Sequence, residues 1–295
     1  MSVSVVIPAY NGSAYIEQAI LSVLGQQRCP DEILIYDDNS TDDTLDICRR
    51  YKDHVSVFSD PSGPSGFVGG WNKAIARAGG DYISILHQDD LLEPGFIRIG
   101  MAALERNPDI RHLFCICSYI DDRGRSVGES YLSDNASEVR LTGKEYIRIY
   151  QQLGSPHIHR CPGVITHRSI FDQCRYEPAA GHIADDDFFY RVGMYTDVMG
   201  ILQPLAAFRV HDRSVTGGLQ DAELAGKLMD DYIYQCRQWK GHPFLDEPTY
   251  SYFLKKAGKY IRRFIGYGIR RRNAGMIAQG IKRWNTLRSL RRHLE

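Results

Sequence analysis

Residues 82–90 of the chain read Tyr-Ile-Ser-Ile-Leu-His-Gln-Asp-Asp. The apolar run 82–86 predicts a short buried strand, and Asp89 and Asp90 follow at the point where that strand ends. Pro94 comes shortly afterwards and favours the start of a helix. In an open α/β sheet, ligands bind beyond the carboxyl ends of the strands, so these two carboxylates are expected to face a ligand. Capping of the following helix is the alternative role for both acids.

The sequence on either side of this stretch repeats the same pattern. Apolar runs at 3–7, 33–36 and 55–58 each precede a polar turn and a segment with helical spacing. Four strand–turn–helix repeats in about the first hundred residues predict a mostly parallel, Rossmann-like, three-layer α/β sheet. Further expected elements are strands at 113–120, 164–166 and 204–210, a mobile polar loop at 125–140 and a helix at 144–152.

Charge is unevenly distributed along the 295 residues, although the net charge is zero. Residues 242–295 contain 13 Lys and Arg but only 3 Asp and Glu. We therefore expect an α/β domain over residues 1–218 and a helical, basic C-terminal region over 219–295. Aromatic and basic residues alternate in 250–292, which is typical of an amphipathic helix attracted to an anionic membrane surface. A helical cap with a solvated basic face is the alternative, and the acidic body argues against nucleic-acid binding.

Several classes of protein are excluded by missing patterns. The seven cysteines include no C-x-x-C pair, which indicates reduced thiols rather than a zinc ribbon or dithiol site. We find no secretion signal and no apolar run long enough to cross a bilayer. The expected location is therefore cytoplasmic. If the basic tail binds lipid, the protein would lie peripherally on the inner face of the plasma membrane. No dinucleotide-binding, Walker or nucleophile-elbow motif is present.

Three acidic clusters mark the candidate site, at 37–38, 89–90 and 185–187. Because parallel strands point the same way, the first two are expected at one edge of the sheet. Clustered carboxylates repel one another, which raises their pKa values unless a cation or a hydrogen-bonding ligand compensates. Oxygen ligands suit Mg²⁺ or Mn²⁺, and such ions commonly bind together with substrate phosphates. The sequence therefore predicts a nucleotide diphosphate with a metal ion.

Six motifs in order resemble those of family-2 inverting glycosyltransferases with the GT-A fold. They are residues 5–11 (Val-Val-Ile-Pro-Ala-Tyr-Asn), 37–42, 66–72 continuing into 80–82, 87–90, 184–187 and 208–214. The resemblance covers about residues 3–217. Two positions depart from the family pattern: His87 stands where an acid is usual, and Ala184 stands where Glu is usual.

The resemblance implies roles for individual residues. Asp185 would be the general base, Asp89 would bind Mg²⁺ or Mn²⁺, and His211 would lie near that metal or the diphosphate. The nucleotide would be held by Pro8, Ala9, Tyr10, Asn11, Asp37, Asp38, Asn72, Gln88 and Asp90. Uncertain positions on the acceptor or phosphate side are His87, Asp186, Asp187, Arg209 and Ser214. The implied donor is a nucleotide-diphosphate sugar, a UDP-sugar by preference, and the implied acceptor is a saccharide or lipid-linked saccharide of cell-surface polysaccharide or glycolipid synthesis.

Other roles stay open for the same residues. Acids at 185–187 also suit the first turn of a helix, and turn chemistry explains residues 39–40 without a ligand. Tyr10 is equally suited to a core, and His211 to a satisfied structural role. At the level of the whole protein, the alternatives are a sugar nucleotidyltransferase and a non-catalytic nucleotide-sugar-binding scaffold.

Overall fold

The computed structural model of the chain describes residues 1–129, 137–152, 160–211 and 222–291. The chain forms two compact units. We call Met1–Tyr176 with Tyr190–Val210 the sheet unit, and Glu177–Phe189 with His211–Glu295 the helical unit. The short segment Glu177–Phe189 thus groups with the C-terminal helices, whereas a boundary drawn in chain order would leave it with the sheet.

All described strands belong to the sheet unit. They are β1 (Val3–Ala9), β2 (Glu32–Asp37), β3 (Ser56–Ser59), β4 (Tyr82–Ile85), β5 (Leu91–Leu92), β6 (His112–Ile120), β7 (Ser126–Glu129), β8 (Glu138–Leu141), β9 (Val164–His167) and β10 (Val198–Arg209). They form one sheet in the order β3-β2-β1-β4-β9-β6-β10-β5, with β7 beside β6 and β8 beside β10.

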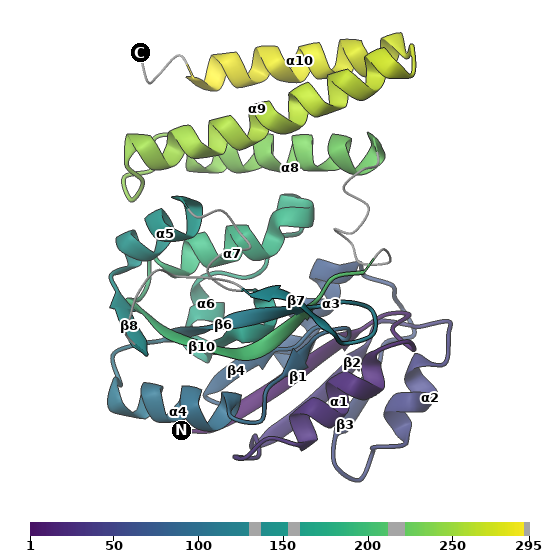
Figure 1. Ribbon diagram of the computed structural model, residues 1–295, viewed down its shortest axis with the longest axis vertical. Helices are drawn as coiled ribbons and strands as arrows, with labels where there is room; N and C mark the ends of the chain where they lie inside the picture. The colour runs from purple at the N-terminus through teal and green to yellow at the C-terminus, as the bar shows by residue number, and fades with distance from the viewer. Residues whose placement is uncertain (130–136, 153–159, 212–221, 292–295) are drawn as a thin grey trace. The chain divides into compact units, whose positions relative to one another are not determined.

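Helices cover both faces of this sheet (Figure 1). Those of the sheet unit are α1 (Ile16–Leu24), α2 (Thr44–Arg49), α3 (Phe67–Arg77), α4 (Phe96–Arg106), α5 (Gly143–Gln152), the 3₁₀ turn η1 (Cys161–Gly163) and α6 (Arg168–Gln173). Helices α1, α2 and α4 lie on one face, and α3 lies on the other (Figure 1). Strand β1 is buried along its whole length, and its side chains join those of α1 in the main apolar core. This burial explains why β1 is a continuous β-branched run rather than an alternating one.

The parallel register at one half of the sheet places the candidate site. Strand β1 pairs in parallel with both β2 and β4, and Ala9 lies beside Asp37 at the end of the β1–β2 ladder. The turn after β2 and the stretch after β4 therefore leave the sheet at the same edge, as predicted. In the other half, β9 runs antiparallel to β4 and β6, whereas β10 runs parallel to β6.

Two expectations about individual elements are wrong. The segment 125–140, expected as a mobile loop, contains β7 and β8 in its described part. These strands have few large apolar groups because each pairs with only one neighbouring strand. Strand β10 begins at Val198 rather than at Pro204. It continues through Pro204 because the register shifts on both sides of that residue, and such an irregularity accommodates a residue without a backbone N–H.

The helical unit contains η2 (Pro178–Ile183), the first six residues of α7 (Ala184–Val192), α8 (Ala222–Trp239), α9 (Glu247–Arg270) and α10 (Ala274–Arg291). Helix α9 lies between α8 and α10 (Figure 1). Its apolar residues Phe253, Ile261 and Phe264 are buried, so its apolar face is used for packing and its basic residues occupy the surface. No helix in the described part is both long and apolar enough to cross a bilayer.

Candidate active site

The turn after β2 is built on two buried acids. Asp37 is fully buried, and its Oδ2 accepts hydrogen bonds from the Ser40 N–H (3.2 Å) and the Ser59 hydroxyl (3.3 Å). Its Oδ1 has no hydrogen-bond partner. The Asp38 carboxylate accepts from both the N–H and the hydroxyl of Ser65, each at 2.7 Å. Asp38 therefore fastens the 60–66 loop to the sheet, whereas Asp37 retains one oxygen for a further donor.

The loop after β1 is held by hydrogen bonds to neighbouring segments. Tyr10 is 44% exposed, which excludes the core role considered for it. Its backbone N–H donates to Gln88 Oε1 at 2.8 Å, and its carbonyl accepts from Gln88 Nε2 at 3.0 Å. Asn11 has a positive φ of 49°, and its Oδ1 accepts from the Thr41 N–H at 2.8 Å. This conformation suits Asn, which tolerates the left-handed region better than most residues.

Gln88 thus acts as an extension of the sheet beyond the end of β4. Its amide supplies one donor and one acceptor, which is the pairing that another strand residue would make. Asn72 also bonds within the protein, because its Nδ2 donates to the Tyr176 carbonyl at 2.7 Å. For both residues the contacts favour shaping the site; contact with the nucleotide stays a prediction.

His87 lies directly after β4 and packs on an aromatic side chain that the sequence did not single out. Its ring stacks on Trp71 with a centroid distance of 4.7 Å and an interplanar angle of 21°. Burial lowers the pKa of His87, and the nearby Asp89 opposes that shift only in part. The imidazole is therefore neutral at neutral pH. A neutral imidazole can donate a hydrogen bond to a phosphate or ligate a metal. His87 can therefore still contact a diphosphate or a metal ion, although the family usually has an acid at this position.

Asp89 and Asp90 occupy different environments. Asp90 is 1% exposed, and burial, with repulsion from Asp89 as a second cause, raises its pKa well above the usual value. Its Oδ1 accepts from the Arg209 backbone N–H at 2.8 Å. Its Oδ2 has no hydrogen-bond partner and lies 3.7 Å from His87 Nδ1. Asp89 is partly exposed, so it is the carboxylate of the two that is accessible to a ligand.

The side chain of Arg209 is a buried clamp rather than the acceptor or phosphate contact that we considered. It is 1% exposed. Its Nε donates to the Asp89 carbonyl at 2.8 Å, Nη1 to the Asp121 carbonyl at 3.0 Å, and Nη2 to Gln18 Oε1 at 2.8 Å. Because three separate segments meet on one guanidinium, Arg209 fixes the backbone on which Asp89 is carried.

A divalent ion fits the donors at this edge. The described residues contain no cluster of three or more His, Cys, Asp and Glu that could hold a metal. Mg²⁺ and Mn²⁺ sites that include a substrate diphosphate require only one or two carboxylates, because phosphate oxygens and waters supply the other ligands. Asp89, together with the Asp90 oxygen that has no hydrogen-bond partner, matches that requirement, and a nearby cation would lower the pKa of Asp90.

The helical unit contains the third acidic cluster. Asp185, Asp186 and Asp187 begin α7; Asp185 is partly exposed, and the other two are buried. The Asp186 N–H donates to Asp185 Oδ1 at 2.9 Å, so the helix start orients this carboxylate. Burial raises the pKa of Tyr232 well above its usual value, and the charge of Asp186 adds to that effect.

A kink before α7 sets the direction in which that helix starts. Gly181 has φ 60°, and a Cβ there would lie 2.2 Å from Asp231 Oδ1. Asp231 accepts from the backbone N–H of His182 at 3.0 Å and lies 3.1 Å from its Nδ1. Neither residue was predicted, because nothing in the sequence relates them across 49 positions. His211 also belongs to the helical unit, and Ser214 lies outside the described residues.

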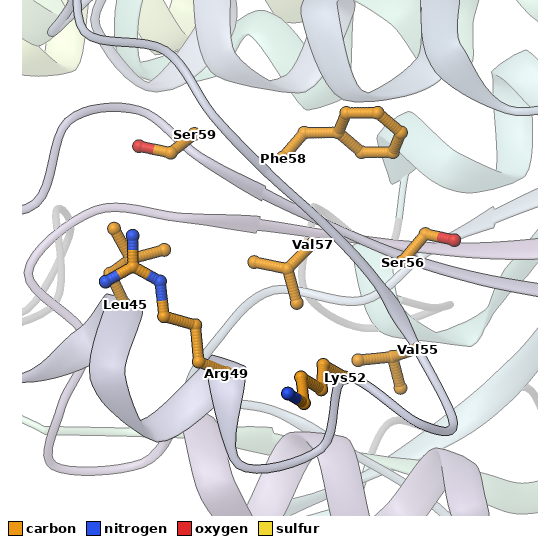
Figure 2. A pocket seen from close by; sticks show the side chains of 8 residues that line it. All are labelled: Leu45, Arg49, Lys52, Val55, Ser56, Val57, Phe58 and Ser59. Atoms are coloured by element: carbon orange, nitrogen blue, oxygen red, sulfur yellow. The ribbon is translucent and has the colours of Figure 1, made fainter.

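A cavity of about 460 Å³ lies between α2 and the edge strand β3. Figure 2 shows the side chains that line it: Leu45, Arg49, Lys52, Val55, Ser56, Val57, Phe58 and Ser59. It contains no carboxylate and none of the predicted site residues. The candidate site is therefore the polar edge beyond β1, β2 and β4 and not this cavity.

Comparison with known proteins decides the family. A sequence model described as "Glycosyl transferase family 2" matches residues 4–174, more than half of the chain. The chain belongs to this family. An uncharacterized glycosyltransferase of Rickettsia prowazekii (strain Madrid E) is 32% identical over 277 residues, which cover 89% of this chain and 82% of that protein. This family-2 glycosyltransferase also shares 33% identity over 141 residues with a chondroitin synthase of Escherichia coli, but the match covers 48% of this chain and 21% of that protein.

Solved structures show the same fold at low sequence identity. Residues 1–349 of S. aureus TarS in complex with UDP-GlcNAc match with a TM-score of 0.60 and 17% identity, over 100% of this chain and 93% of that one. The mannosyltransferase PcManGT from Pyrobaculum calidifontis, in complex with GDP-Man and Mn²⁺, matches with a TM-score of 0.58 and 16% identity, over 98% and 84%. The predicted GT-A fold and the assignment as a glycosyltransferase are thus confirmed.

Proposed function

We propose that the protein is an inverting glycosyltransferase that uses a nucleotide-diphosphate sugar, by preference a UDP-sugar. The observation that carries this proposal is the edge beyond β1, β2 and β4, where the accessible Asp89 lies beside the buried Asp90 and close to the Tyr10 loop. Two similar structures contain nucleotide sugars, UDP-GlcNAc in TarS and GDP-Man in PcManGT. The proposed acceptor is a saccharide or a lipid-linked saccharide, in line with the similarity to a chondroitin synthase.

In the proposed mechanism, residues of the sheet unit bind the donor. The Tyr10 loop and Asp37 hold the base and ribose, and the neutral His87 lies beside the diphosphate. A divalent ion held by Asp89 would supply positive charge that stabilises the leaving diphosphate; the role of His211 stays a prediction. Arg209 keeps Asp89 in place by holding its carbonyl.

Asp185 is the proposed general base. It removes the proton from the acceptor hydroxyl while the hydroxyl oxygen forms a bond to the anomeric carbon and the bond to the diphosphate breaks. One carboxylate suffices, because direct displacement inverts the anomeric carbon without a covalent enzyme intermediate. The Asp186 N–H on Asp185 Oδ1 orients the base.

The test combines donor turnover with the stereochemistry of the product. Nucleotide release should occur with a nucleotide sugar and Mn²⁺, and NMR of the product should show an anomeric configuration opposite to that of the donor. Asp185→Asn should lower kcat by about 10²–10⁴-fold, the usual contribution of a general base, with little change in donor affinity. The matched control is Asp172→Asn, an exposed acid on α6, which should retain wild-type turnover.

Three outcomes would contradict the proposal. Retention of configuration would exclude direct displacement, and unchanged turnover in Asp185→Asn would exclude this base. Release of pyrophosphate, with formation of a nucleotide sugar, would instead identify a nucleotidyltransferase.

A further inference from the structure

A groove between α9 and α10 combines an apolar floor with a ring of positive charge. It has a volume of about 200 Å³ and is lined by Leu254, Lys255, Gly258, Arg262, Trp284, Leu287, Arg288 and Arg291. The two helices run antiparallel and approach closely at glycines: a Cβ on Gly258 would lie 3.5 Å from Leu287, and one on Gly280 would lie 2.4 Å from Ile265. The small residues let the helices meet, and the long side chains form the walls.

The four cations of this groove have no acidic partner in the part of the chain that the structure describes. Lys255, Arg262, Arg288 and Arg291 form no ion pair or hydrogen bond with any described residue, and all four are exposed. Two other basic residues of the helical unit do form ion pairs, Lys227 with Glu223 and Arg283 with Asp230. The one specific contact within the groove is that of the Arg262 guanidinium, which lies over the Trp284 ring at 5.8 Å. Four uncompensated cations around one groove favour an anionic ligand.

Exposed apolar side chains continue the groove along both helices. Ile269 is 61% exposed and Ile281 is 51% exposed, and no other large apolar side chain in the described part of the helical unit is as exposed. Ile269 follows Lys255 and Arg262 at intervals of seven residues and therefore lies on the same face of α9. Ile281 precedes Arg288 by seven residues on α10 in the same way. Exposed isoleucines cost solvation free energy if the ligand is a soluble polyanion, but they are stabilising at a lipid surface.

We propose that this face, made of the groove cations with Ile269, Trp284 and Ile281, binds an anionic phospholipid surface. The cations contact lipid phosphates, the two isoleucines enter the region between headgroups and acyl chains, and Trp284 lies at the headgroup level. Attachment of this kind is peripheral, because Phe253, Leu254, Ile261 and Phe264 of α9 are buried. The proposal does not depend on the transfer reaction, since it rests on the helical unit alone.

The experiment measures partition of the full-length protein onto vesicles of phosphatidylcholine alone and of phosphatidylcholine mixed with phosphatidylglycerol. Binding should require phosphatidylglycerol and weaken with salt. Each basic residue near an anionic surface changes the partition coefficient about fivefold. The variant with all four groove cations changed to Gln should therefore bind more than about 100-fold more weakly. The matched control changes Arg237, Lys240, Arg270 and Lys282 to Gln, which removes the same charge from exposed residues outside the groove and should change binding by less than about tenfold.

A second variant separates lipid from soluble polyanion. Ile269→Ser with Ile281→Ser leaves the charge unchanged and should weaken vesicle binding about tenfold without altering binding of inorganic polyphosphate. Phosphatidylglycerol with brominated acyl chains should quench tryptophan fluorescence in the wild type and much less in Trp284→Phe. Circular dichroism and gel filtration establish that each variant is folded. Equal losses in the groove variant and the matched control, or vesicle binding that the isoleucine variant leaves unchanged, would overturn the proposal.

Discussion

Replacement of Arg209 by Met should be among the most destabilising single changes in the sheet unit. The guanidinium is buried and makes three part-buried hydrogen bonds of 3.0 Å or shorter to oxygen acceptors, and each bond from a charged donor contributes about 1.5–3 kcal/mol. Removal of a buried charge also recovers several kcal/mol of desolvation cost, and Met fills much of the space. The expected net loss in the free energy of unfolding is about 3–5 kcal/mol.

The measurement is thermal unfolding of the purified protein. For a unit of this size, 1 kcal/mol corresponds to about 2–4 °C in Tm, so Arg209→Met should lower Tm by about 6–20 °C. The matched control is Arg125→Met, which removes a side chain that is 69% exposed and paired with Asp121. Such surface pairs contribute about 0–1 kcal/mol. If both variants unfold within about 2 °C of the wild type, the buried guanidinium does not hold the segments together as argued.

Three further predictions concern the site and its support. Gln88→Leu removes both hydrogen bonds to the Tyr10 backbone. It should raise KM for the nucleotide sugar about tenfold, with a smaller effect on kcat. An unchanged KM would show that the loop keeps its conformation without Gln88. Burial lowers the pKa of His112 to about 3. Below pH 6.5 the His112 imidazole is therefore protonated in the unfolded chain but stays neutral in the folded chain. Stability should therefore fall by up to about 1.4 kcal/mol per pH unit between pH 6.5 and 4, and His112→Asn should flatten that slope in urea unfolding at several pH values. Gly181→Ala combines a positive φ with a clash against Asp231 and should lower Tm by several degrees together with turnover; wild-type values of both would refute the role of the kink.

The parallel, layered arrangement of the first half of the sheet follows directly from the sequence. Continuous apolar runs, polar turns and helical spacing alternate there, and right-handed crossovers leave little choice of topology. The acids at 37–38 and 89–90 could be placed at one edge for the same reason. Burial could not be predicted so well: the four acids look alike in sequence, but Asp37, Asp38 and Asp90 are buried whereas Asp89 is partly exposed.

Residues that act over long sequence distances were the hardest to predict. The partners of Arg209 lie 88 to 191 positions away, and an Arg at the end of a strand is equally typical of a solvated side chain. The strand at β10 was predicted too short because Pro204 usually marks a boundary, whereas here the irregular pairing with β6 removes that restriction. In the C-terminal region, aromatic and basic periodicity predicted helices correctly, but periodicity alone does not say which face packs against another helix.

The grouping of Glu177–Phe189 with the C-terminal helices has a consequence for dissecting the protein. A chain cut after Val210 would retain this segment but lose α8, whose Asp231 accepts from the His182 N–H, so the truncated form would lose the support of the kink. Exchange of the helices between relatives would likewise have to move two pieces of polypeptide together. Loss of activity on C-terminal truncation therefore reports on the integrity of the Asp185 helix as much as on any binding by the deleted residues.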